Sequence, residues 1–190
     1  MNKFSLKTKY IARQIYFYEE IDSTQKEIWR QIAKGNIKNG GLIITKRQSS
    51  GIGTHGRSWY SDEKSLILSL ALFSAKNVEK YENFTYEIAV LLVNVFKRLY
   101  NIDLDIKSPN DLMIMDKKVG GILVETKILS GQIKEMVIGV GINTNMTFIP
   151  EELKKIATSI KNEYGVEIDN MRIIAEFCND LEELYEKRRL

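Results

Sequence analysis

The segment at residues 51–59 carries three glycines within six residues, followed by an arginine. Glycine is kept where a Cβ would block positive φ or a close approach to a ligand, so this density predicts a loop whose backbone can close around an anion. The spacing matches the dinucleotide-binding pattern G-x-G-x-x-G and nearly matches a P-loop. Both motifs need a helix after the loop, whereas the short apolar run at 65–73 is typical of a strand. A strand on each side of the loop therefore argues against both motifs.

Further polar residues stand beside turns and glycines in four other segments. Lys118 precedes two glycines and a buried strand, so its ammonium could stabilise a charged ligand that the bare backbone lets approach. A solvated hairpin lysine is the alternative. Ser23 and Thr24 suit the cap of a helix, and Pro109 suits a turn. The segments are Asp22-Ser23-Thr24-Gln25, Lys107-Ser108-Pro109-Asn110-Asp111, Lys118-Val119-Gly120-Gly121-Ile122-Leu123-Val124-Glu125 and Gly139-Val140-Gly141-Ile142-Asn143.

The elements that must position these segments are mixed along the chain. The strands expected after residue 100 follow one another closely, and such short connections favour antiparallel hairpins because a parallel crossover needs about a dozen residues or more. The pattern predicts an α+β fold in which helices pack a mixed, mostly antiparallel sheet. Apolar spacing predicts strands at 15–18, 41–46, 65–73, 102–106, 112–115, 121–126 and 136–142, and helices at 23–35, 79–99, 150–160 and 170–187.

Composition excludes several classes of protein. The chain of 190 residues has 28 basic and 25 acidic residues, and this even balance does not indicate a nucleic-acid partner. No apolar run approaches the roughly 18 residues that span a bilayer, so we expect no membrane partner. Cys178 is the single cysteine, so no intramolecular disulfide can form, which fits a reducing cytoplasm, and it is expected to be a buried hydrophobe. Residues 1–14 are basic and are expected to form a solvated N-terminal arm, with one domain over 15–190.

Taken together, the glycine loop and the four segments resemble the biotin protein ligase family, in the family's order and spacing from about residue 15 to the C-terminus. The resemblance implies the class II aminoacyl-tRNA synthetase-like fold of biotin and lipoate ligases. It implies a biotin-[acetyl-CoA-carboxylase] ligase that forms biotinyl-adenylate from biotin and ATP with Mg²⁺. The biotinyl group then passes to a lysine of a biotin carboxyl carrier domain. The resemblance also allows a homodimer.

The resemblance assigns residues to each part of this reaction. A ureido ring needs hydroxyl and amide partners, and an adenylate needs cations and backbone donors where charge develops. The catalytic candidates are Lys118, Asp111 and Arg57; Asp111 would orient or deprotonate the acceptor lysine and is the one candidate for contacting Mg²⁺, since no cluster of metal ligands is evident. The biotin-site candidates are Ser23, Thr24, Gln48, Gly51, Lys118, Gly121 and Leu123. The nucleotide-site candidates are Gly53, Gly56, Arg57, Trp59, Asn110 and Asn143.

Departures from the family pattern leave alternatives open. The family's loop usually carries several arginines, whereas Ile52 and Thr54 stand here in two of those positions, and Ser108 replaces a usual tryptophan. We therefore expect weaker retention of the adenylate. A biotin-binding or regulatory protein with weak ligase activity is one alternative, and a lipoate or octanoyl transferase is another. Neither an N-terminal DNA-binding segment nor the C-terminal β-barrel of longer family members is evident in the sequence.

Overall fold

A computed structural model describes residues 6–189 of the chain. Within this part, one mixed sheet has the strand order β1-β2-β3-β7-β6-β5-β4. β1 runs parallel to β2, and every other neighbouring pair is antiparallel, which confirms the predicted fold class. The strands are β1 (Ile15–Ile21), β2 (Leu42–Gln48), β3 (Leu66–Asn77), β4 (Asp105–Lys107), β5 (Asp111–Ile114), β6 (Lys117–Leu129) and β7 (Gln132–Ile142).

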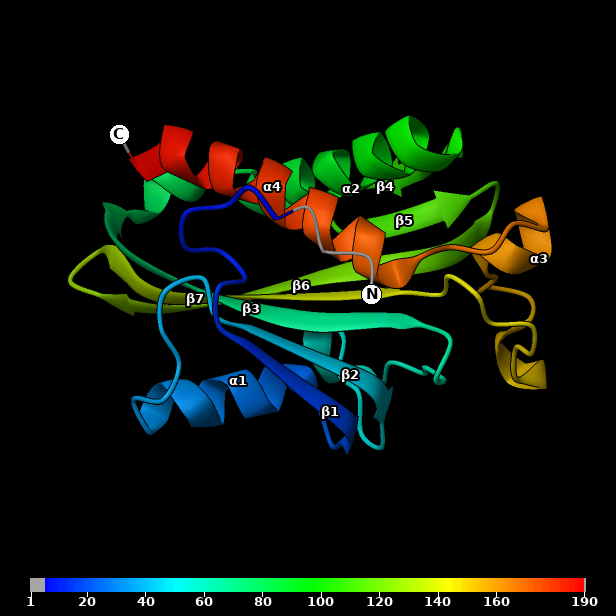
Figure 1. Cartoon of the computed structure of the whole chain (residues 1–190), viewed down its shortest axis with the longest axis horizontal. Helices are drawn as coiled ribbons and strands as arrows, with labels where there is room; N and C mark the ends of the chain where they lie inside the picture. The colour runs from blue at the N-terminus through cyan, green and yellow to red at the C-terminus, as the bar shows by residue number, and fades with distance from the viewer. Residues whose placement is uncertain (1–5, 190) are drawn as a thin grey trace.

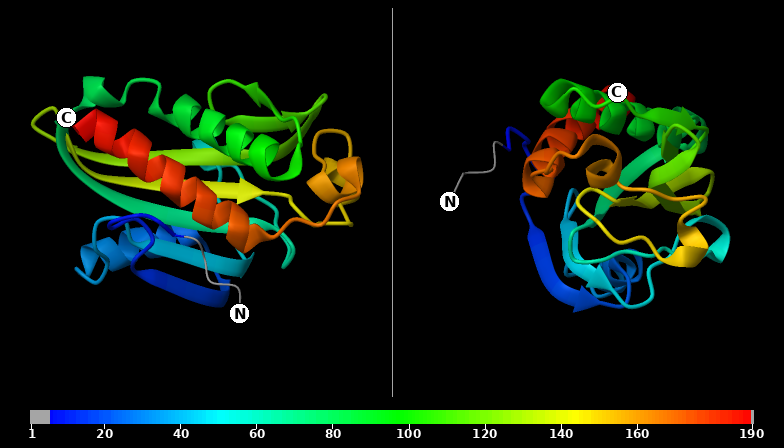
Figure 2. Two further views of the ribbon diagram at one scale, coloured as in Figure 1. Left: turned by 45° about the horizontal axis from the view of Figure 1, so that its top comes forward. Right: turned by 90° about the vertical axis from the view of Figure 1, so that its right-hand side faces the viewer.

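Helices cover both faces of this sheet (Figure 1). α2 (Phe84–Tyr100) and α4 (Asn170–Arg189) lie on one face, and α1 (Thr24–Ala33) lies on the other, as the turned views also show (Figure 2). Alternation along β3 and β7 sends Leu68, Leu70 and Ile138 into the main core with α2 and α4. A smaller core lies between α1 and the sheet, and it includes Ile28 of α1.

Local signals explain where the main hairpin and helices begin and end. The long β6–β7 hairpin turns through Ser130 and Gly131, both at positive φ (51° and 73°), a combination that matches the twist of paired strands. The Ser23 side chain accepts a hydrogen bond from the Lys26 amide and caps α1. Asn101 ends α2 in the left-handed region. Of these residues, Ser23 fixes where α1 begins.

Two predicted helices differ from the structure. The one expected at 79–99 begins at Phe84, after a 3₁₀ turn at Val78–Tyr81. The one expected at 150–160 is replaced by a 3₁₀ turn at Glu151–Leu153 and the short α3 (Ile160–Tyr164). Between those two elements, the Ile156 carbonyl accepts from the Lys118 amide and the Thr158 amide donates to the Lys118 carbonyl, both at 2.9 Å. The backbone there bonds to β6 and so cannot continue a helix.

The predicted arm also differs where it is described. The Glu182 carboxylate on α4 accepts hydrogen bonds from the backbone amides of Lys9, Tyr10 and Ile11, and Ile11 is fully buried. Residues 6–14 therefore pack on the domain, and the expectation of a solvated arm was wrong for them. The part of that prediction at 1–5 lies outside the described residues. The strand expected at 102–106 is shortened and shifted to β4 at Asp105–Lys107, and Ile102 and Leu104 before it are buried in the core.

Candidate active site

The sheet face beneath α1 has a depression where β6 and β7 carry glycines at Gly121, Gly139 and Gly141. The pairing of β3, β6 and β7 places Ser69, Leu123 and Gly139 side by side, with Gly121 opposite Gly141 on the same face. A Cβ on Gly139 would lie 2.6 Å from Gln25 Oε1, and one on Gly141 would lie 2.6 Å from Trp59 Nε1. Glycine at these two positions therefore makes room for the side chains above them.

A cavity of about 40 Å³ lies in this depression. Its floor comes from β3, β6 and β7, its wall from the start of α1, and its cover from the glycine loop with Trp59. Small-molecule sites usually measure roughly 300–1,000 Å³, so a ligand of the expected size enters only if Trp59 and the loop shift. The predicted residues that line the cavity are Thr24, Gln48, Gly53, Trp59, Asn110, Lys118, Gly121 and Leu123.

Thr24 and Gln48 form the polar end of this cavity. The Thr24 backbone amide donates to Gln48 Oε1 at 2.9 Å, and the Thr24 hydroxyl lies 3.2 Å from the same oxygen. Ser69 Oγ lies 2.9 Å from Thr24 Oγ1 and 3.0 Å from Gln25 Oε1. Since the Gln48 oxygen is engaged by Thr24, the amide nitrogen of Gln48 is the group left to donate to a ligand.

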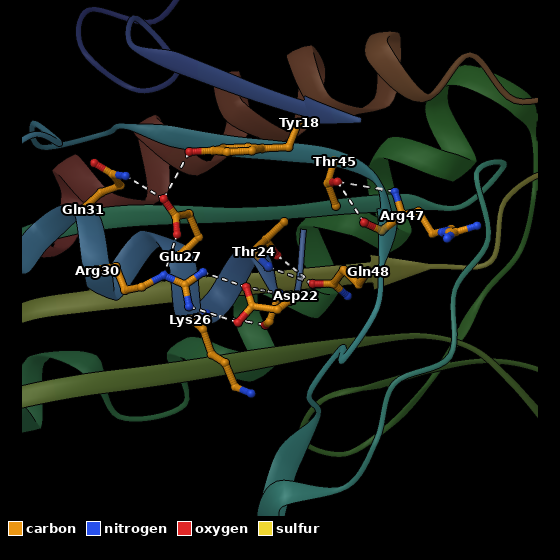
Figure 3. A network of polar contacts seen from close by, with 11 residues as sticks. Tyr18, Asp22, Thr24, Lys26, Glu27, Arg30, Gln31, Thr45, Arg47 and Gln48 are labelled. Carbon is orange, nitrogen blue, oxygen red and sulfur yellow. Dashed lines mark hydrogen bonds and ion pairs between the residues drawn. The ribbon is translucent and has the colours of Figure 1, made fainter. Parts of the chain in front are cut away.

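Charged residues anchor the start of α1 beside this polar end (Figure 3). Arg30 donates to both oxygens of Asp22, at 2.6 and 3.0 Å, and its Nε donates to Glu27. The hydrogen bonds from Arg30 lower the pKa of Asp22 to about 2. The Asp22 carbonyl also accepts from the Ser50 amide at 2.9 Å. The first turn of α1 is thereby tied to the segment that leads into the glycine loop.

Lys118 and Asp111 meet at the mouth of the cavity. Lys118 Nζ donates to Asp111 Oδ1 at 2.6 Å and lies 5.5 Å from the centre of the Trp59 ring. Both side chains keep access to solvent, with exposed fractions of 30% for Lys118 and 25% for Asp111. The bare backbone of Gly121 lies directly beneath the Lys118 side chain. A fixed cation thus stands where an anionic group on a ligand would emerge.

A second cavity of about 210 Å³ adjoins the first. The two share Gly53, Thr54, Trp59 and Lys118 in their linings. Asn143 lines the second cavity: its Nδ2 donates to the Thr158 carbonyl at 2.9 Å, while its buried Oδ1 has no partner among the described residues. Aliphatic residues make up much of the remaining wall, namely Met146, Ile149, Leu153, Ile156 and Ala157. The combination suits a planar group with a hydrogen-bond donor at its edge.

Backbone hydrogen bonds within the glycine loop hold its two ends together. Ile52 and Ser58 form an isolated antiparallel bridge, and the Gly53 amide donates to the Arg57 carbonyl at 2.7 Å. The exposed Arg57 side chain folds back, with its NH2 group donating to Thr54 Oγ1 at 3.1 Å. Strands precede and follow this loop, which agrees with the prediction against a P-loop or dinucleotide fold.

Not every predicted site residue lines a cavity wall close to Lys118. Ser23 is fully buried and caps α1. Asp111 lines neither cavity, but it accepts a hydrogen bond from Lys118, which lines both. Gly51 and Gly56 line an outer groove on the other side of the loop. The sequence analysis singled out the segments of Gln25, Gly139 and Gly141 but gave these lining residues no site role, and it missed Ser69. The period-two glycines and a serine within an apolar strand were signals that could have found three of the four.

Two other predictions concern metal and thiol chemistry. Within residues 6–189 no group of three or more His, Cys, Asp or Glu side chains could hold a metal ion. Cys178 is buried in the main core, and burial raises the pKa of its thiol to about 12, so it behaves as the hydrophobe that was predicted.

None of the helices in residues 6–189 is long and apolar enough to cross a membrane.

Comparison with known proteins gives consistent matches. The sequence model of the biotin/lipoate A/B protein ligase family matches residues 17–143. The bifunctional ligase/repressor BirA of Bacillus subtilis is 33% identical over 186 residues, which cover 96% of this chain and 57% of that protein. The biotin protein ligase of Aquifex aeolicus in complex with biotin and ATP superposes with a TM-score of 0.77 at 27% identity, covering 93% of this chain and 72% of that one. The chain thus spans little more than half the length of its curated relative.

Proposed function

Because the chain belongs to the biotin/lipoate A/B protein ligase family, we propose that it activates biotin with ATP and transfers the biotinyl group to a lysine of a carrier domain. The observation that carries this proposal is the junction of the two cavities at Lys118. One cavity has amide and hydroxyl groups for a ureido ring, and the other has the apolar wall and Asn143 for adenine. The carboxylate and the α-phosphate would then meet beside the ammonium group.

In the first step, a biotin carboxylate oxygen attacks the α-phosphorus of ATP, and the bond to pyrophosphate breaks. Lys118 stabilises the negative charge that builds up there, since a fixed cation acts most strongly where charge develops. Gly121 beneath it has no side chain, so the ligand can approach the protein backbone there. Arg57 would leave Thr54 to meet the phosphates, because a guanidinium binds phosphate oxygens in pairs. Mg²⁺ enters as part of the ATP substrate complex.

In the second step, the acceptor lysine attacks the acyl carbon and AMP leaves. A lysine with its ordinary pKa near 10.4 is protonated at neutral pH, so it needs a base or an orienting carboxylate. Asp111 lies at the mouth of the cavity, 2.6 Å from Lys118, and is suited to that role. The acceptor we propose is the biotin carboxyl carrier domain of acetyl-CoA carboxylase or a related carboxylase, and the site of action is the cytoplasm.

The test is incubation with biotin, ATP, Mg²⁺ and a carrier domain, followed by mass analysis of the acceptor. Lys118→Ala should keep the fold and lower adenylate formation at least about tenfold, which corresponds to ~1.4 kcal/mol of lost transition-state stabilisation. Lys127→Ala is the matched control, because Lys127 lies on the same strand and pairs with Glu135. Near-normal pyrophosphate release by folded Lys118→Ala protein would contradict the assignment.

Two alternatives give different results in the same assay. The observation that would support a regulatory biotin-binding protein is the glycine loop, in which Arg57 bonds to Thr54 and two expected arginines are replaced. Such a protein would bind biotin without biotin-dependent release of pyrophosphate. A lipoate or octanoyl transferase would be inhibited by lipoate or would use octanoyl donors, whereas a biotin ligase would not.

A further inference from the structure

We propose that Glu125 is a positioning residue that sets the hydrogen-bond polarity of the cavity's polar end, so that this end accepts an N–H and donates to a C=O. The inference deepens the proposed function, on which it rests, because a cyclic urea such as the biotin head presents those two groups. Glu125 does not line the cavity. It acts through Gln25 and Ser69, two residues that no catalytic role has accounted for.

Glu125 is held by two donors from α1. Gln25 Nε2 donates to Glu125 Oε2 at 2.9 Å, and Trp29 Nε1 donates to the same oxygen at 2.7 Å. Gln25 is 3% exposed and Glu125 is half-buried. A carboxylate only accepts hydrogen bonds, so the amide nitrogen of Gln25 must face Glu125. The amide oxygen of Gln25 then faces the opposite way.

The opposite side of Gln25 is where Ser69 and Gly139 lie. Ser69 Oγ is 3.0 Å from Gln25 Oε1, and the missing side chain of Gly139 leaves room for that oxygen. Ser69 also lies 2.9 Å from Thr24 Oγ1, and it has a single proton for these two neighbours. Gln25 Oε1 has no proton of its own, so the Ser69 proton belongs in that contact.

The consequence falls on Thr24. When Ser69 donates to Gln25, it does not donate to Thr24, and the Thr24 hydroxyl can give its own proton to Ser69 or to Gln48 Oε1. The lone pairs of Thr24 Oγ1 then remain for a ligand N–H. Gln48 is fixed with its oxygen toward the Thr24 amide at 2.9 Å, so its NH₂ group faces a ligand C=O. Reversal of Gln25 would turn Ser69 toward Thr24 and occupy one of those lone pairs.

The decisive variants remove or keep the acceptor at position 125. Glu125→Met removes both hydrogen bonds with little change in length, and we expect biotin to bind about tenfold more weakly, as for loss of one good hydrogen bond. Glu125→Gln retains an oxygen that can accept from both Gln25 and Trp29, so it should restore most of the affinity. Glu135→Met is the control: Glu135 lies on the same sheet face and pairs with Lys127 at 3.3 Å.

Three measurements separate positioning from a general structural effect. Calorimetry gives the biotin Kd, thermal unfolding gives stability, and the NMR signal of the Trp29 indole N–H reports the network without ligand. That signal should shift in Glu125→Met and stay near its wild-type position in Glu125→Gln. In a Thr24→Val background, Glu125→Met should weaken binding by less than twofold, because its effect passes through Thr24.

The possible results are distinct. Wild-type protein that does not bind biotin contradicts the proposed function and the ligand named here. If the wild type binds biotin and Glu125→Met binds it equally well, the inference alone is wrong. It is also wrong if the effects of Glu125→Met and Thr24→Val are additive, or if Glu125→Gln is as weak as Glu125→Met, since charge and not hydrogen-bond direction would then be responsible.

Discussion

The two faces of β3 and β7 carry opposite kinds of residue on the same backbone. Toward α2 and α4, the strands place buried aliphatic side chains such as Leu70 and Ile138. Toward α1, the neighbouring residues Ser69 and Gly139 line the candidate biotin cavity, while Ala71 and Val137 farther along pack under α1. At the cavity, strand alternation thus places core residues on one face and cavity-lining residues on the other.

The sharpest way to test this separation is a pair of adjacent substitutions. Leu70→Ala should lower the free energy of unfolding by roughly 2–5 kcal/mol, as large-to-small core changes do, with an unchanged biotin Kd, because Leu70 is buried in the main core and does not line the cavity. Ser69→Ala should weaken biotin binding several-fold and lower stability by only about 1 kcal/mol. Urea unfolding and calorimetry measure the two quantities. Equal effects on binding would show that the two faces are not independent.

Asp111→Asn extends the comparison to the reaction steps. We expect transfer to the acceptor lysine to slow at least about tenfold, and adenylate formation to slow less, because the carboxylate serves the attacking amine. Single-turnover measurements with preformed adenylate separate the two steps. Poor adenylate formation combined with normal transfer would assign Asp111 to the first step, through its 2.6 Å contact with Lys118.

Thr54→Arg tests the cover of the ligand face. The loop is closed by backbone bonds, and its one arginine bonds to Thr54, so we expect the wild-type protein to release adenylate and label bystander lysines. Restoring a cation at position 54 should reduce that labelling several-fold, since charge-assisted hydrogen bonds to phosphate contribute roughly 1.5–3 kcal/mol each. Thr54→Lys is the comparison for charge alone. Wild-type protein that retains its adenylate through gel filtration would show that the backbone bridge suffices.

The smallest effect is expected at the start of α1. The pKa of Asp22 is lowered to about 2 by Arg30, so this pair stabilises the folded protein above the ordinary carboxyl pKa, and the gain is lost as the pH falls toward 2. Because the side chains are 38% and 42% exposed, the contribution is below about 1 kcal/mol. Asp22→Asn should flatten the decrease in unfolding free energy between about pH 5 and about pH 2. Glu19→Gln, which breaks the exposed pair with Lys46, controls for loss of a charge.

Local patterns predicted much of the fold. The strands around the glycine loop, the cap at Ser23 and the apolar spacing that predicted most of α2 all depend on residues close together in sequence, and the structure has them. The extended segment at 156–158 could not be predicted in this way. Its backbone bonds to Lys118, some forty residues earlier, and such a contact leaves no periodic signal in the segment itself.

The sequence by itself determined the family, the alternation of β3 and β7, and the identity of Lys118, Asp111, Thr24 and Gln48 as site candidates. Only the tertiary structure decided which groups complete the cavity. Gln25, Ser69 and Glu125 come from α1, β3 and β6, and their hydrogen bonds span 44 and 100 positions of the chain. The direction of each of those bonds depends on the next one, so the polarity of the site exists only when all three elements are packed together.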